Sequence, residues 1–113
     1  MTASGDFVTD AEVAWDSGGP GIRRKVLGYD DALMTVRVVF EAGAEGLPHS
    51  HPHVQTCYVV SGVFDVTISG LTRRLRAGDS FKVPSGALHG AVCLEAGELI
   101  DSFTPARRDF LAG

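Results

Sequence analysis

The residues of this sequence best suited to chemistry are its four histidines and one nearby glutamine. Three histidines lie in the segment His49-Ser50-His51-Pro52-His53, Gln55 follows, and the fourth histidine is His89. Alternate side chains of a β-strand project from one face, so imidazoles two residues apart can converge on one ion. Neutral imidazole is the commonest metal-ligand side chain, and an amide oxygen adds a hard donor. The spacing predicts a site for one divalent metal ion.

The same histidines also allow two structural interpretations. They could form a solvated polar face of a strand, or His49 and His51 could be core residues with satisfied hydrogen bonds. A lone histidine would favour one of these, but His-x-His with a third polar residue in register favours the metal. We expect His53 at the rim of the pocket, because Pro52 can shift the register of a strand.

A second group of polar residues lies near the C-terminus. Asp101 and Phe103 share strand parity, so both can face the cavity that holds the metal, and Arg107 could fold over its mouth. An arginine would hold a carboxylate by two parallel hydrogen bonds, an aromatic ring would pack on a sugar face, and Asp101 would shuttle a proton. This set suits an acidic sugar. A purely structural role is the alternative for each residue. Asp101 could pair with an arginine, Phe103 could belong to the core, and Arg107 could be exposed to solvent.

Short strands must position these residues, since 14 glycines and 5 prolines indicate frequent turns. Apolar residues alternate with polar ones from Met34 to Phe40, which is typical of a half-buried strand. Many short strands separated by turns predict an all-β sandwich or barrel, with a single helical turn at Arg107–Leu111. The predicted strands are Leu33–Glu41, His49–Val60, Val63–Ser69, Leu71–Arg76, Ser80–Val83, His89–Glu95 and Glu98–Thr104.

Size and charge limit the class of protein. The 113 residues, 44% of them hydrophobic, suit one domain over residues 1–113. A net charge of −4 argues against nucleic acid as a partner. We interpret Arg23-Arg24-Lys25 and Arg73-Arg74-Arg76 as solvated strand edges. The sequence has no apolar run of the ~18 residues that cross a membrane and no secretory signal, so we expect no membrane partner and a cytoplasmic location.

Two segments resemble the two sequence motifs of the cupin family. The segment from Gly46 to Gly62 resembles the first motif, in which His-x-His is followed by Glu or Gln and then by glycine. The segment from Gly78 to His89 resembles the second, Gly-x5-Pro-x-Gly-x2-His. The resemblance implies a cupin double-stranded β-helix, which is a small jelly-roll barrel. It also implies that four side chains face the barrel interior as metal ligands: His49, His51, Gln55 and His89.

This sequence departs from the family pattern at two positions. Gln55 stands where glutamate is usual, and Cys93 stands where asparagine is usual. A neutral ligand leaves the ion its full double charge, which favours Lewis-acid over redox chemistry. Three imidazoles and one amide oxygen suit Zn, Ni, Fe, Mn and Co alike. Cys57 and Cys93 are expected to be free thiols, and parity places both in the cavity wall as small hydrophobic residues.

The C-terminal stretch, with its Pro-x-Arg-x-Asp-Phe-Leu ending, resembles the KdgF group of small cupins, named for pectin degradation. Members of that group open the ring of 4,5-unsaturated monouronates to give linear keto sugars. By this resemblance, Asp101, Phe103 and Arg107 match the acid, aromatic and carboxylate-binding positions. The resemblance implies a metal-assisted sugar-acid isomerase.

Two other functions are weighed beside this one. An Fe(II)-dependent small-molecule dioxygenase would need oxygen, whereas ring opening does not. A non-catalytic sugar-binding cupin would bind a uronate without converting it. Small cupins often dimerise, so a homodimer is expected. The apolar residues that would either form its interface or cover the core are Phe7, Val8, Val13 and Trp15.

Overall fold

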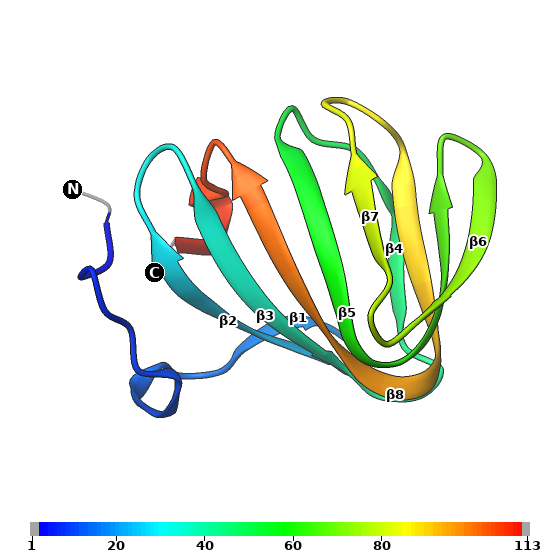
Figure 1. Ribbon diagram of the computed structural model, residues 1–113, viewed down its shortest axis with the longest axis horizontal. Helices are drawn as coiled ribbons and strands as arrows, with labels where there is room; N and C mark the ends of the chain where they lie inside the picture. The colour runs from blue at the N-terminus through cyan, green and yellow to red at the C-terminus, as the bar shows by residue number, and fades with distance from the viewer. Residues whose placement is uncertain (1–2, 112–113) are drawn as a thin grey trace.

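The computed structural model describes residues 3–111, which form a single antiparallel sheet rolled into a barrel (Figure 1). The prediction of an all-β fold is confirmed, and so is the helical turn after Pro105. The strands are β1 Asp16–Gly19, β2 Ile22–Tyr29, β3 Met34–Phe40, β4 Glu45–His49, β5 Val54–Ile68, β6 Leu71–Arg76, β7 Ser80–Val83 and β8 His89–Thr104. The 3-10 helices are η1 Asp10–Glu12 and η2 Arg108–Leu111.

Strands β5 and β8 are the longest, and they connect the two layers of the barrel. The first part of β8 pairs with β4 and with the second part of β5. The second part of β8 pairs with β3 and with the first part of β5. Figure 1 shows both strands bending together at the bottom of the view. The bend folds one sheet over itself, so that one face of each layer is turned inward.

Glycines make this bend possible. Gly62 has φ +86°, and a Cβ atom on it would lie 2.6 Å from both the Glu95 carbonyl oxygen and the Gly97 Cα. The predicted strand end at Ser61-Gly62 is therefore wrong. The strand continues to Ile68 with register shifts around Gly62, because glycine lets the chain bend without leaving the sheet.

The core lies between the layers and follows the predicted alternation. Met34, Val36, Val38 and Phe40 of β3 are all buried, and the residues between them are partly exposed. Phe40 contacts Phe64 of β5 edge to face, with ring centroids 5.2 Å apart. Such a core stabilises the rigid walls from which the functional side chains project.

The predicted strand from His49 to Val60 is wrong in its first part. The chain leaves β4 after His49 and enters β5 at Val54. His49 pairs with His89 at one end of β8, whereas Val54 pairs with Thr104 at the other end. The residues between them must therefore cross from one layer of the barrel to the other. His51 lies in this crossing and owes its position to the crossing rather than to strand parity.

Strand β2 was not anticipated from the sequence, and the N-terminal segment covers its outer face. Lys25 is only 6% exposed, so the interpretation of its basic run as a solvated edge is wrong there. Its ammonium lies 4.6 Å from the Trp15 ring centroid, which makes Trp15 part of this cover. Phe7 is 97% exposed and covers no core. None of the helices within residues 3–111 is long and apolar enough to cross a membrane.

Candidate metal centre and ligand cavity

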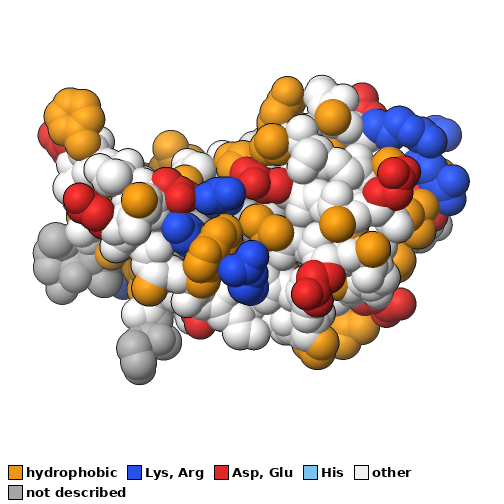
Figure 2. Space-filling view, turned by 90° about the horizontal axis from the view of Figure 1, so that it is seen from below, with side chains coloured by type: hydrophobic (Ala, Val, Ile, Leu, Met, Phe, Trp, Pro, Cys, Tyr) orange, Lys and Arg blue, Asp and Glu red, His pale blue; other side chains and the backbone are white. Residues whose placement is uncertain are grey.

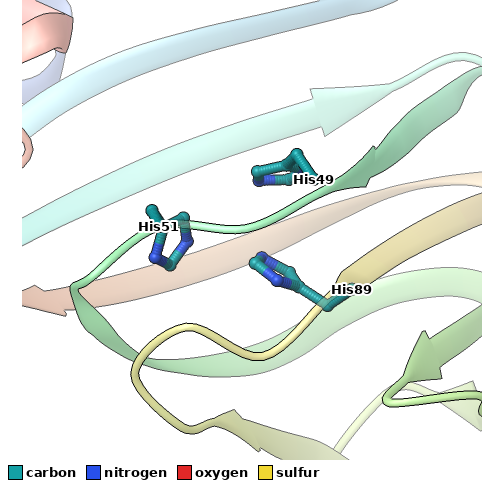
Figure 3. A group of neighbouring side chains, drawn as sticks. All are labelled: His49, His51 and His89. Atoms are coloured by element: carbon teal, nitrogen blue, oxygen red, sulfur yellow. The ribbon is translucent and has the colours of Figure 1, made fainter.

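Three imidazoles converge inside the barrel (Figure 3). His49 ends β4, His89 begins β8 beside it, and His51 enters from the crossing between β4 and β5. Their candidate ligand atoms all lie within 4.8 Å of one another. His51 and His89 are buried, whereas His49 is exposed at the open side. The three histidines are thus placed to bind a metal ion.

Hydrogen bonds fix which ring nitrogen of each histidine is free. Each Nδ1 atom lies close to a backbone carbonyl oxygen two residues away. The distances are 2.8 Å from His49 to Leu47, 3.0 Å from His51 to His53, and 2.9 Å from His89 to Ala87. A carbonyl oxygen only accepts, so each Nδ1 must donate, and each neutral ring presents an Nε2 lone pair. The His89 Nε2 is buried and has no hydrogen-bond partner within residues 3–111. A cation fits this arrangement.

Burial also favours the neutral form of two of these rings, His51 and His89. Removal from water lowers the pKa of both His51 and His89, and the positive charge of Arg107 lowers these pKa values further. A protonated imidazole cannot bind a metal, so a lowered pKa extends the pH range in which the rings are competent ligands.

Gln55 adds an oxygen to this group. Its Oε1 lies 3.1 Å from the His51 Nε2, while its amide Nε2 donates to the Asp101 carboxylate at 3.0 Å. Two acceptors therefore face each other, and a cation between them would bind both lone pairs. The reversed amide would instead place its carbonyl oxygen against the Asp101 carboxylate, which is unfavourable while that group is ionised.

Asp101 lies on β8 opposite Cys57 of β5. Its carboxylate accepts hydrogen bonds from the Gln55 amide and the Cys57 thiol, so it is not paired directly with an arginine. Burial raises the pKa of Asp101 to about 6, against the opposing effect of these two donors. A carboxyl group with such a pKa can both accept and release a proton near neutral pH.

Phe103 and Arg107 form the wall beside the histidines. The Phe103 side chain is 2% exposed and its ring centroid lies 5.8 Å from that of His51, so it belongs to both the core and the cavity wall. The Arg107 guanidinium lies 4.3 Å from the Phe110 ring centroid and 5.2 Å from that of Phe103. Its Nε and Nη2 bind the two Asp109 carboxylate oxygens at 3.0 and 2.8 Å. Arg107 is thus held in place rather than freely exposed.

One cavity of about 320 Å³ joins these groups. It has a polar side lined by His49, Gln55, His89, Asp101 and Arg107, and an apolar side that includes Phe40, Phe81, Leu99 and Phe103. The residues predicted from the two distant sequence segments are therefore brought to one place. His53 is outside the histidine cluster, with its ring centroid 5.3 Å from that of His51.

Sequence reasoning missed Arg24, which also lines the cavity. The available signal was the alternation of Ile22, Arg24 and Val26, which places the arginine on an otherwise apolar face. Cys57 and Cys93 are buried as small core residues, with 1% and 0% exposure, but neither lines the cavity, so the predicted place of both in the cavity wall is wrong. Both are free, and burial raises the pKa of each thiol, which makes them poor nucleophiles.

Comparison with known proteins gives consistent matches. A family model described as "Cupin domain" matches residues 36–102. The pectin degradation protein KdgF of Dickeya dadantii (strain 3937) is 45% identical over 107 residues, which cover 93% of this chain and 97% of that protein.

Two solved structures are also similar along nearly their whole length. An RmlC-like cupin from Shewanella frigidimarina NCIMB 400 has a TM-score of 0.94 and 45% identity, over 97% of this chain and 99% of that one. KdgF from a Halomonas species has a TM-score of 0.89 and 44% identity, over 95% of this chain and 99% of that one.

Proposed function

Because this chain belongs to the cupin family, we propose that it is a metal-dependent enzyme that opens the ring of a 4,5-unsaturated uronate to give a linear keto sugar. The full-length similarity to KdgF, named as a pectin degradation protein, supports a substrate derived from a uronate polymer. The observation that carries the proposal is the single cavity shared by the histidine cluster, Asp101 and Arg107. It combines a cation site, a proton carrier and an anion-binding group.

The metal would be held by the Nε2 atoms of His49, His51 and His89 and by the amide oxygen of Gln55. When bound, a divalent cation supplies Lewis-acid chemistry by polarising hydroxyl or ring oxygens of a sugar. Zn, Ni, Fe, Mn and Co remain equal candidates for this donor set.

The ring opening is an isomerisation that needs one proton transfer. The C1 hydroxyl gives up its proton, and its electron pair forms the C1 carbonyl as the bond between C1 and the ring oxygen breaks. That bond's electrons form the C5 carbonyl, and the electrons of the C4–C5 double bond take a proton at C4. Asp101 accepts the hydroxyl proton and returns it to C4. Its pKa of about 6 suits both steps.

Arg107 and Phe103 orient the sugar for this transfer. In our proposal, Arg107 binds the C6 carboxylate, and the Phe103 ring packs against a face of the sugar. Arg107 is already fixed by Asp109 and Phe110, so little conformational freedom is lost on binding. Such pre-organisation accounts for a large part of the rate gain in reactions of this kind.

Asp101→Asn tests the proposal directly. The amide has the same shape but carries no proton between substrate atoms, so turnover of an unsaturated galacturonate should fall by about 10²–10⁴-fold. The loss of the C4–C5 double bond can be followed by ultraviolet absorbance, and metal content by elemental analysis. Asp65→Asn is the matched control, since Asp65 pairs with Arg74 outside the cavity.

The outcomes separate the competing functions. The proposal is supported if the wild type turns over the substrate without oxygen and Asp101→Asn loses this turnover while it retains the metal. Unchanged turnover in Asp101→Asn removes this residue from the mechanism. Turnover that needs Fe(II) and oxygen indicates a dioxygenase, and uronate binding without conversion indicates a binding protein.

A further inference from the structure

We propose that Arg24 is a second anion-binding residue of the cavity and that it holds the substrate carboxylate together with Arg107. The proposal rests on the function proposed above, because it names the residue that completes recognition of an acidic sugar. It starts from the fold. Ile22, Arg24 and Val26 alternate on β2, and Arg24 pairs across to Val38 of β3, which is buried. The guanidinium is therefore directed into the barrel and lines the cavity.

The hydrogen-bonding capacity of Arg24 is largely unused. An arginine has five N–H donors, yet the Arg24 Nε is buried and has no hydrogen-bond partner in the part of the chain that the structure describes. Its Nη2 lies 3.5 Å from the Asp16 carboxylate, a long contact to a side chain that is 65% exposed. A buried donor without an acceptor is energetically unfavourable. An anion in the cavity would remove this cost after a small rotation of the side chain.

Arg107 cannot supply all the donors that a carboxylate needs. Asp109 already accepts from its Nε and from one Nη2 hydrogen, which leaves three of the five N–H donors of the guanidinium. A carboxylate has two oxygens that together accept about four hydrogen bonds. These acceptor sites outnumber the three donors that Arg107 has left, and the cavity provides a further donor group in Arg24.

Phe110 brings the two arginines to the same end of the cavity. The Arg24 Cζ lies 3.8 Å from the Phe110 ring centroid, and the Arg107 Cζ lies 4.3 Å from the same centroid. All three residues line the cavity. Both guanidinium groups lie over the Phe110 ring, and these cation–π contacts help to hold them at this end of the cavity. The geometry suits a carboxylate placed between them, with the sugar extending toward the histidines.

The test measures binding as well as turnover. The two ligands are galacturonate and galactose, which differ only in having a carboxylate or a hydroxymethyl group at C5. Each is titrated by calorimetry into the wild type and into R24Q, R24K and R23Q. Each protein is measured with and without bound metal. Arg23 is the matched control, because it neighbours Arg24 but stacks on Trp15 outside the barrel. R24Q should bind galacturonate at least about tenfold more weakly and galactose equally well. R24K should recover part of the loss, since lysine keeps the charge without the planar fork.

Three results would overturn the proposal. The first is that R24Q binds galacturonate as tightly as the wild type does. If R24Q fails to fold, the same comparison is made with R24K. The second is an equal loss for galactose, which would mean that Arg24 only shapes the cavity. The third is a wild type that does not prefer galacturonate to galactose. A wild type that binds galacturonate through Arg24 and leaves unsaturated uronates unconverted would instead contradict the proposed reaction alone.

Discussion

Two clusters of polar residues lie on opposite sides of the same sheet, and they differ in how completely they are paired. The outer ion cluster consists of Asp10, Lys25, Arg37 and Glu98, next to Trp15. Asp10 accepts from Lys25 at 3.0 Å and from Arg37 at 3.0 Å, and Arg37 also binds both carboxylate oxygens of Glu98. Figure 2 shows acidic side chains beside basic ones on one face of the molecule.

The inner cluster, formed by His49, His51, Gln55 and His89, has the opposite character. Each imidazole satisfies its Nδ1 against the backbone and leaves its Nε2 directed toward the centre. The Gln55 Oε1 adds another acceptor to this group, against the His51 Nε2. The comparison teaches that pairing, rather than polarity, separates a structural cluster from a binding one. The outer residues hold the N-terminal segment in place, whereas the inner histidines are placed to bind a metal ion.

The largest effect is expected for His89→Ala. It removes a buried Nε2 that has no hydrogen-bond partner within residues 3–111 and that we propose as a metal ligand. Loss of a residue that only supports a ligand by a hydrogen bond lowers metal affinity by about 10–100-fold, and loss of this ligand should lower it further. Elemental analysis after dialysis measures this loss. Added metal should raise the melting temperature of the wild type and leave that of the variant unchanged. Metal retention by His89→Ala would contradict the distinction between the clusters.

A smaller effect is expected at the cysteine beside Asp101. Cys57→Val keeps this buried position apolar but removes the thiol that donates to the Asp101 carboxylate, so kcat should fall about tenfold while metal content stays constant. Cys57→Ser should restore much of the rate, because it restores a donor. Cys93→Val is the control, since the Cys93 thiol donates to the Glu95 carbonyl oxygen. Equal rates in Cys57→Val and the wild type would show that this hydrogen bond is not needed.

The smallest effect is expected in the outer ion cluster. Hydrogen bonds from Lys25 and Arg37 lower the pKa of Asp10 below 3.8, so its stabilising contribution is present above that pH and is lost as the pH falls through the lowered value. Asp10→Asn should lower the melting temperature slightly at neutral pH. As the pH falls, the variant should lose less stability than the wild type, because it has no Asp10 carboxylate to protonate. Turnover and metal content should not change. Loss of metal in this variant would show that the outer cluster supports the site.

Local patterns in the sequence predicted those parts of the structure that depend on neighbouring residues. The alternation from Met34 to Phe40 gave a strand and its buried face, and the paired strands at 63–76 followed from Gly70 between them. The convergence of His49 and His89 was also predicted, although the family resemblance, rather than strand parity, linked the two segments.

Long-range pairing explains what could not be predicted. Continuation of β5 through Gly62 depends on the close approach of Gly97, which is far away in sequence. The crossing that carries His51 depends on β4 and β5 pairing with opposite ends of β8. Arg24 was overlooked because two basic neighbours concealed its inward parity, and the pairing of β2 with β3 places it opposite the buried Val38, on the side of the cavity.

The most direct measurement is a crystal structure of the metal-loaded protein with anomalous scattering recorded at the absorption edge of the metal. The account predicts one ion bound by the Nε2 atoms of His49, His51 and His89, at about 2.0–2.1 Å if the ion is zinc. The Nδ1 atoms should keep their bonds to the backbone carbonyl oxygens. An ion bound through Nδ1, or an ion located away from the three rings, would contradict the account.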